Sequence, residues 1–239
     1  MEIKYFESYE KMSEQAAEIV ANEIKAKPTK NFVLGLPTGS TPLGMYANLI
    51  EKNKSGLLDF SKVTTFNLDE YYPIKHDNDQ SYYKFMFDNL FGSININHEN
   101  INIPDGEAVD AGSECESYEE KIKKSGGIDL MVIGIGPNGH IGFNEPDNFL
   151  LPDTHIAVLT EETKEANKRF FDSVEQVPDK ALTMGMGSIL KAKKILMLVS
   201  GKSKTEIFKK FLQGEISTSN PSSFLHLHND VTVLSDVGI

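Results

Sequence analysis

The feature that most constrains the fold is a regular alternation between short, continuous apolar runs and longer amphipathic segments. The apolar runs predict strands at 31–36, 63–68, 128–134, 194–199 and 231–234. Because these runs are not broken by a polar residue at every second position, they are typical of strands covered on both faces. The amphipathic segments predict helices at 7–26, 42–54, 81–91, 111–124, 160–171 and 203–212. The pattern predicts one α/β domain over 1–239, with a mostly parallel sheet and helices on both faces.

Composition narrows the possible partners and the compartment. The 24 Lys and Arg residues against 35 Asp and Glu residues give a net charge of −11, which disfavours a nucleic-acid or anionic-membrane partner. A single cysteine, Cys115, permits no internal disulfide, and we expect it to be inert. No apolar run approaches the ~20 residues that cross a bilayer. The N-terminal residues also lack the apolar core of a signal peptide, so we expect a cytoplasmic protein.

The first expected strand is followed by the loop Pro37-Thr-Gly-Ser-Thr-Pro42. Ser40 and Thr41 suit a helix N-cap, and Pro42 suits the first helical position. Gly39 allows close backbone approach, and the Thr38, Ser40 and Thr41 hydroxyls add donors beside a helix start, which together favour anion binding. An ordinary capped turn remains the alternative.

Two adjacent carboxylates, Asp69 and Glu70, follow the second expected strand. Neighbouring residues of an extended chain point to opposite faces, so only one of the two can face a given pocket. The one that does is a candidate general base, because ligands of such folds bind at the carboxyl ends of the strands. A solvated acidic turn is the alternative interpretation.

The glycine-rich segment Gly134–Pro146 follows the third expected strand and carries three polar side chains: Asn138, His140 and Glu145. Its glycines formally match a dinucleotide fingerprint, but Pro137 interrupts the loop and no long helix follows it. A histidine oriented by a carboxylate and an amide can move protons near neutral pH. We therefore interpret the segment as a loop that aims His140.

Two cations, Arg169 and Lys204, and two histidines, His226 and His228, lie outside these three segments. Arg169 and Lys204 lie near expected helix starts or faces, and Lys204 comes just past an expected strand, where a basic residue in an acidic protein is a candidate phosphate ligand. His226 and His228 could share one face of an extended segment. With no third ligand evident, we do not expect a metal site there.

Four segments together resemble the glucosamine-6-phosphate deaminase family, in chain order and over most of the sequence. They are Leu34–Pro42, Thr65–Tyr71, Gly134–Pro146 and Ala181–Gly187. The resemblance implies a Rossmann-like fold and the hydrolysis of glucosamine 6-phosphate to fructose 6-phosphate and ammonia. It implies no cofactor and no metal.

The resemblance also implies residue roles. His140 would assist opening of the sugar ring, with Asn138 and Glu145 orienting its imidazole. Asp69 would then move the proton from C2 to C1, before the ketimine at C2 is hydrolysed. The positions implied in substrate binding are Thr38, Gly39, Ser40, Thr41, Tyr82, Arg169 and Lys204.

The sequence departs from some family members in two ways. Asn138 stands where some members have an aspartate, so Glu145 must do more to stabilise the imidazolium, and we expect activity to survive. The serine and two basic residues that bind an allosteric sugar phosphate in larger members correspond to Asn148, His155 and Ala157. We expect no such activation, and a monomer or simple homo-oligomer.

Three alternatives remain open at this point. A lactonase or isomerase acting on another sugar phosphate would keep the fold and change the chemistry. A non-catalytic sugar-phosphate sensor would have no need of Asp69, His140 and Glu145. A nucleotide-dependent dehydrogenase rests only on the weak glycine match.

Overall fold

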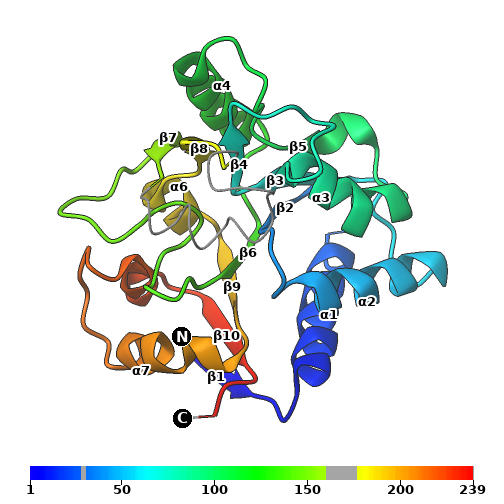
Figure 1. Ribbon diagram of the computed structural model, residues 1–239. Coiled ribbons are helices and arrows are strands. Elements are labelled where there is room, and N and C mark those ends of the chain that lie inside the picture. The colour runs from blue at the N-terminus through cyan, green and yellow to red at the C-terminus, as the bar shows by residue number, and fades with distance from the viewer. Residues whose placement is uncertain (28–30, 160–176, 239) are drawn as a thin grey trace.

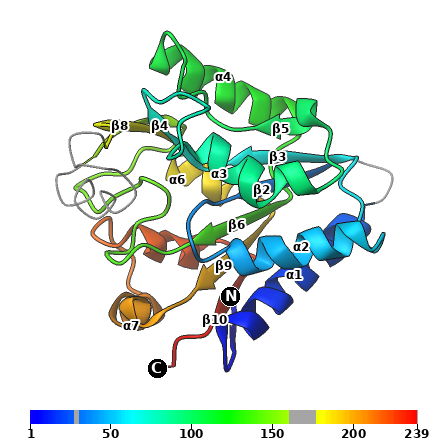
Figure 2. The ribbon, with the colours of Figure 1, turned by 45° about the vertical axis from the view of Figure 1, so that its right-hand side comes forward.

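The computed structural model describes residues 1–27, 31–159 and 177–238 of the chain. Its main element is a seven-stranded sheet in the order β1-β10-β9-β6-β2-β3-β5, and every pairing in it is parallel. These strands are β1 (Glu2–Tyr5), β2 (Phe32–Leu36), β3 (Val63–Asn67), β5 (Ile101–Asn102), β6 (Leu130–Gly134), β9 (Lys194–Val199) and β10 (Val231–Ser235). Figure 2 places the first and last strands of the chain next to each other.

Helices cover both faces of this sheet, as expected. Figure 1 shows α1 and α2 to one side of β2, β6 and β9, and α6 and α7 to the other. The helices of the described residues are α1 (Tyr9–Lys25), α2 (Leu43–Lys54), α3 (Tyr82–Asn89), α4 (Ala111–Lys124), α6 (Met186–Leu190) and α7 (Thr205–Leu212). The helix expected at 160–171 lies outside the described residues.

The apolar runs are continuous because the side chains of each strand pack into two hydrophobic cores, one on each face of the sheet. In β9, Leu196 and Leu198 join the cluster packed under α1, α2 and α3. The alternate residues Ile195, Met197 and Val199 join the cluster packed under α4, α6 and α7. Successive side chains of a strand point to opposite faces, so a strand buried on both sides must be apolar throughout.

A second, smaller sheet lies beyond the carboxyl end of β3, and the sequence analysis missed all three of its strands. It consists of β4 (Asp69–Tyr72), β8 (Lys180–Thr183) and β7 (His155–Val158), paired antiparallel in the order β4-β8-β7. Its strands have four residues each, too short to show a period, and polar residues such as Asp69 and His155 begin them.

The described residues contain no helix with the length and apolar character needed to cross a bilayer.

Candidate active site

The strand order places four chain segments at one edge of the main sheet. The chain runs outward from β2 to β3 on one side, then returns to β6 and runs outward to β9 and β10 on the other. The reversal falls between β2 and β6, and ligands of doubly wound sheets bind in the crevice at such a reversal. The segments that leave the carboxyl ends of β9, β6, β2 and β3 carry Lys204, His140, Gly39 and Asp69 respectively.

The loop that follows β2 is held by two tyrosines rather than by a helix cap. The Tyr9 hydroxyl lies 3.1 Å from the carbonyl oxygens of Ser40 and of Thr41, and it accepts a 2.7 Å bond from the N–H of Gly44. The buried Tyr46 hydroxyl donates to the Pro37 carbonyl. Both tyrosines come from helices packed beneath the loop, so its backbone is fixed independently of any ligand.

Our expectation of a Ser40 or Thr41 cap with Pro42 at the first helical position is wrong by one residue. Pro42 itself is the N-cap of α2, with φ of −80°, and no side chain caps the helix. Within the described residues, no hydrogen bond occupies the Thr38, Ser40 or Thr41 hydroxyl. Gly39 has φ of +92°, and a Cβ built on it meets nothing within 4 Å, so the loop opens to solvent there. Unused hydroxyls beside an open glycine suit an anion.

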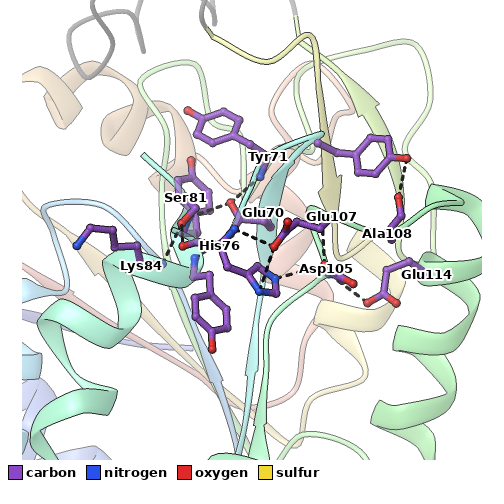
Figure 3. A network of polar contacts seen from close by, with 12 residues as sticks. Glu70, Tyr71, His76, Ser81, Lys84, Asp105, Glu107, Ala108 and Glu114 are labelled. Atoms are coloured by element: carbon purple, nitrogen blue, oxygen red, sulfur yellow. Dashed lines mark hydrogen bonds and ion pairs between the residues drawn. The ribbon is translucent and has the colours of Figure 1, made fainter. Parts of the chain in front are cut away.

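Asp69 and Glu70 do face opposite ways, but both are buried rather than solvated. They form the start of β4, with exposed fractions of 6% and 0%. The Glu70 carboxylate accepts hydrogen bonds from the backbone N–H groups of Tyr71 at 2.8 Å, Tyr82 at 2.8 Å and Tyr83 at 2.7 Å. Figure 3 shows Glu70 directed at the start of α3, near His76 and Ser81. The Glu70 carboxylate therefore holds the start of α3 against β4.

Asp69 has no such partners. Among the described residues, no donor is hydrogen-bonded to its carboxylate. Burial, with a smaller contribution from the charge of Glu70, raises its pKa from 3.8 to about 8. Burial also raises the pKa of Glu70 to about 7, against the three backbone donors. An uncompensated buried carboxylate is a stronger base than an exposed one, as proton abstraction requires.

The loop after β6 brings together the three polar residues that the sequence singled out. The Nδ1 atom of His140 lies 3.2 and 3.3 Å from the two carboxylate oxygens of Glu145. Asn138 donates to Glu145 Oε2 at 2.6 Å, and its own oxygen accepts from the His140 N–H at 3.2 Å. A hydrogen on Nδ1 held by Glu145 leaves Nε2 as the basic nitrogen of the imidazole.

Glycines in this loop make room for the imidazole and the neighbouring segments. A Cβ on Gly136 would lie 2.2 Å from His140 Nε2, so only glycine lets the ring occupy this position. Gly139 has φ of +93° and lies against Asn220 and against Ile207 of α7. Gly136 therefore makes room for the His140 ring, whereas Gly139 makes room for Asn220 and Ile207.

Gly142 connects the two halves of the site. A Cβ at Gly142 would lie 3.1 Å from Asp69 Oδ2 and 3.0 Å from Thr183 Oγ1. The loop that carries His140 and Glu145 therefore passes directly beside the Asp69 carboxylate. The chain just before Asp69 is also bonded to the end of β2, because the N–H of Leu68 and the side chain of Asn67 both donate to the Leu36 carbonyl.

The remaining predicted residues are distributed as follows. Tyr82 is the first residue of α3, and its ring stacks on Phe143 with a centroid distance of 6.2 Å. Lys204 ends a short 3-10 helix that directly precedes α7. Arg169 lies outside the described residues, so its position is not tested.

The histidines that we set aside are engaged with the backbone. His226 Nε2 lies 2.8 Å from the Phe211 carbonyl oxygen, and His228 Nε2 lies 2.7 Å from that of Ala192. The described residues hold no cluster of three His, Cys, Asp or Glu side chains suited to a metal ion. Burial raises the pKa of the Cys115 thiol to about 11, which favours its unreactive form.

Sequence reasoning missed Thr183 and Asn144. Thr183 is fully buried, and its hydroxyl accepts a 3.1 Å hydrogen bond from the N–H of Phe143. The Asn144 side chain donates 2.8 Å bonds to the carbonyls of Ile141 and Met184. A signal for these two residues was present in the sequence, since both belong to motifs that carry the family resemblance. Neither has an ionisable side chain of the kind that transfers protons.

The fold and the site define a class of doubly wound α/β enzymes. In this class, ionisable side chains and a loop suited to binding an anion lie at the same edge of one parallel sheet. The family model of glucosamine-6-phosphate isomerases and 6-phosphogluconolactonases matches residues 7–234. The chain belongs to this family.

Curated relatives agree with the family model over nearly the whole chain. A glucosamine-6-phosphate deaminase of Thermoanaerobacter sp. (strain X514) is 58% identical over 229 residues, which are 96% of this chain and 90% of the relative. One from Clostridium novyi (strain NT) is 52% identical over 236 residues, or 99% of this chain and 97% of the relative.

Solved structures give the same picture. A monomeric glucosamine-6-phosphate deaminase superposes with a TM-score of 0.95 at 46% identity, covering 98% of this chain and 97% of the other. A 6-phosphogluconolactonase from Thermotoga maritima superposes with a TM-score of 0.77 at 19% identity, covering 98% of each chain. The second likeness, at so low an identity, concerns the fold alone.

Proposed function

We propose that the chain is a glucosamine-6-phosphate deaminase, converting glucosamine 6-phosphate and water to fructose 6-phosphate and ammonia. The observation that carries the proposal is the position of Gly142, which belongs to the loop of His140 and Glu145. A Cβ atom built on Gly142 would lie 3.1 Å from Asp69 Oδ2. It supports a ligand position shared by the His140 imidazole and the Asp69 carboxylate, which come from distant parts of the chain. The near-full-length relatives that carry this name support the same reaction.

Ring opening is the first step. His140 Nε2 takes the proton of the C1 hydroxyl and passes it to the ring oxygen, and the sugar becomes the open aldehyde. Glu145, which holds Nδ1, stabilises the imidazolium that forms in between. Asn138 keeps the carboxylate and the loop backbone in place through its two hydrogen bonds.

Isomerisation and loss of the amine follow. Asp69 removes the proton from C2 as a proton passes from the C2 ammonium group to O1, which gives the enolamine. Asp69 then returns its proton to C1, and the protonated ketimine forms at C2. Water adds to the ketimine carbon, and ammonia leaves as the C2 ketone forms. These steps are proton transfers and a hydrolysis, so the proposal needs no redox cofactor and no metal.

The phosphate is assigned to the loop after β2. The Thr38, Ser40 and Thr41 hydroxyls, the open backbone at Gly39 and the cation of Lys204 are the groups that would bind it, with Arg169 as a further proposed ligand. Tyr82, the first residue of α3, is proposed to line the sugar. Its ring stacks on Phe143, and its N–H donates to the Glu70 carboxylate.

We further propose that residues 1–239 act as one domain, as a monomer, in the cytoplasm. A 46% identical deaminase of nearly the same length is monomeric, which supports the oligomeric state. The proposed substrate is a charged sugar phosphate that membranes retain inside the cell, which supports the location.

A paired assay tests the function. Purified protein is given glucosamine 6-phosphate in one arm, with ammonia measured, and 6-phosphogluconolactone in the other, with acid release measured. We expect ammonia release and no lactone hydrolysis above the spontaneous rate. Lactone hydrolysis without ammonia release would assign the chain to the other activity of its family, and inactivity in both arms would favour a sensor.

A further inference from the structure

The segment Ala181–Gly187 carries part of the family resemblance, yet none of the steps above uses it. Its first three residues end β8, the central strand of the small sheet, between β4 and β7. Thr183 pairs across the strands with Asp69, and in an antiparallel pair such residues share a face, with Cβ atoms about 5 Å apart. The segment therefore lies directly behind one of the two proton carriers.

The same segment also holds the loop of the other proton carrier. The Thr183 hydroxyl accepts from the N–H of Phe143 at 3.1 Å. The Met184 carbonyl accepts from the Asn144 side chain at 2.8 Å. Phe143 and Asn144 stand between His140 and Glu145, so these two bonds fix the turn that brings the imidazole and its carboxylate together.

A third bond connects the segment to the strand that presents Asp69. The N–H of Met184 donates to the Leu68 carbonyl at 2.7 Å. Thr183 and Met184 are both fully buried, so water does not compete for any of these bonds. Two consecutive residues thus bond to the chain next to Asp69 and to the chain next to His140.

Thr183 is the informative member of the pair because its neighbours in the strand are Ala181 and Leu182, which are buried and apolar. Valine would fill the same volume in this strand and has a similar preference for extended backbone. Packing alone therefore does not require a hydroxyl here. The hydroxyl is required only by the N–H of Phe143, which would otherwise be buried without a partner.

We propose that Thr183 is a positioning residue for the reaction: its hydroxyl holds the His140–Glu145 loop at a fixed separation from Asp69. Thr183 touches neither sugar nor phosphate and acts through the Phe143 amide. The effect of Thr183 on catalysis rests on the proposed function. The positioning of the loop by Thr183 rests only on the hydrogen bond from the Phe143 N–H.

Three variants separate the hydroxyl from the packing of the side chain. Thr183→Val keeps the volume and removes the hydroxyl, and Thr183→Ser keeps the hydroxyl and removes a methyl group. Thr65→Val is the matched control, because Thr65 is also buried in a strand, but its hydroxyl has no hydrogen-bond partner among the described residues.

The kinetic test measures kcat and KM for ammonia release from glucosamine 6-phosphate. We expect Thr183→Val to lower kcat by about 10- to 100-fold, the order of loss that follows misplacement of a reacting group. KM should change by less than about threefold, because Tyr9 and Tyr46 hold the phosphate loop independently. Thr183→Ser and Thr65→Val should stay within about threefold of wild type in both constants.

The structural test measures hydrogen exchange at the Phe143 amide by NMR. Protection should be high in wild type and in Thr183→Ser, and it should fall at least about tenfold in Thr183→Val while amides of β9 keep theirs. The proposal is overturned if Thr183→Val keeps wild-type kcat, or if Thr183→Ser loses as much as Thr183→Val. A wild-type protein that releases no ammonia would instead refute the proposed function. The hydrogen-exchange result would still show whether the Thr183 hydroxyl bonds to the Phe143 amide.

Discussion

At the scale of single residues, the site depends on a contrast between two neighbouring carboxylates. Glu70 is stabilised by three backbone donors and is fixed at the start of α3, whereas Asp69 receives no donor from the described residues. One residue of offset along β4 therefore separates a carboxylate that holds α3 from the carboxylate that we propose as the base. Each has a consequence that can be measured.

The buried Asp69 carboxyl should lower the stability of the folded protein at high pH. Its pKa of about 8 in the folded protein exceeds the ordinary value of 3.8, so the folded state holds a proton that the unfolded chain releases. This contribution to stability is fully present below pH 4 and is lost as pH rises through 8. We expect Asp69→Asn to raise the free energy of unfolding at pH 8 by about 1–3 kcal/mol, with little gain at pH 4.

Denaturant unfolding at the two pH values checks this expectation. Asp59→Asn is a suitable control, because hydrogen bonds from Ser61 and Asn95 lower the pKa of that exposed carboxyl instead of raising it. A variant at Asp69 that is equally or less stable than wild type at pH 8 would show that the carboxylate is compensated in solution.

Glu70 should tune the pH dependence of the reaction. Its pKa of about 7 lies below that of Asp69, so it ionises first and its charge makes ionisation of Asp69 harder. Removing the charge in Glu70→Gln should move the acid limb of the kcat/KM profile to lower pH, since the base is active when deprotonated. Profiles measured between pH 5 and 9 decide the question, and an acid limb that stays in place or moves to higher pH would contradict the assignment.

Asn138 offers a test of the orienting group. Asn138→Ala removes the bonds to Glu145 and to the His140 N–H, and we expect about a 10- to 100-fold loss in kcat, because the imidazole is no longer held in one orientation. Asn138→Asp should retain activity, since the family resemblance implies an aspartate at this position in some members. Steady-state ammonia release compares the three proteins. Unchanged turnover in Asn138→Ala would remove this residue from the site.

At the scale of elements, the loop after β6 depends on which of its glycines face a side chain. Gly136→Ala would place a methyl group 2.2 Å from His140 Nε2, so the ring must move. We expect a loss of about 1–3 kcal/mol in stability and a larger loss in kcat than stability explains. Gly134→Ala, two residues earlier with nothing within 4 Å of its Cβ, should be tolerated.

Thermal unfolding and turnover of both glycine variants provide the comparison. If Gly136→Ala and Gly134→Ala behave alike, then the imidazole does not sit over Gly136 in solution, and the position of Nε2 derived from it is wrong.

The large elements could be predicted from sequence because each is specified by its own residues. The predicted strand at 194–199 and helix at 111–124 coincide with β9 and α4, since burial on two faces or one face leaves a period in the sequence. The small sheet could not be predicted. Each of its strands is defined by partners more than 20 residues away, and Asp69 reads as a turn residue until β8 is seen beside it.

The same reasoning explains what was found and missed at the site. Asn138, His140 and Glu145 lie within eight residues of each other, so their contact followed from the sequence. The closeness of Asp69 to Gly142 and the bond from Phe143 to Thr183 join segments some 40 or more residues apart. No local pattern encodes such a distance.

At the scale of the whole molecule, the described chain lacks the basic groups that a second sugar phosphate would need at the expected allosteric position. Asn148 is exposed, and the imidazole of His155 is engaged with the Asp153 carbonyl at 2.9 Å. We therefore predict hyperbolic kinetics, with no effect of N-acetylglucosamine 6-phosphate on the apparent KM.

Initial rates over a range of substrate, with and without that ligand, check the prediction, and light scattering under assay conditions gives the mass in solution. A sigmoidal curve that the ligand makes hyperbolic, together with a mass of several chains, would contradict both the missing activation and the monomer.

The central claim is that Asp69 removes the proton from C2 of the sugar. The most direct measurement follows glucosamine 6-phosphate deuterated at C2 by NMR and records both loss of the C2 deuterium and release of ammonia, for wild type and for Asp69→Asn. The account predicts that wild type breaks the C2–D bond as ammonia appears, while Asp69→Asn leaves the deuterium in place and lowers ammonia release at least about 1,000-fold. Cleavage of the C2–D bond by Asp69→Asn at the wild-type rate would contradict it.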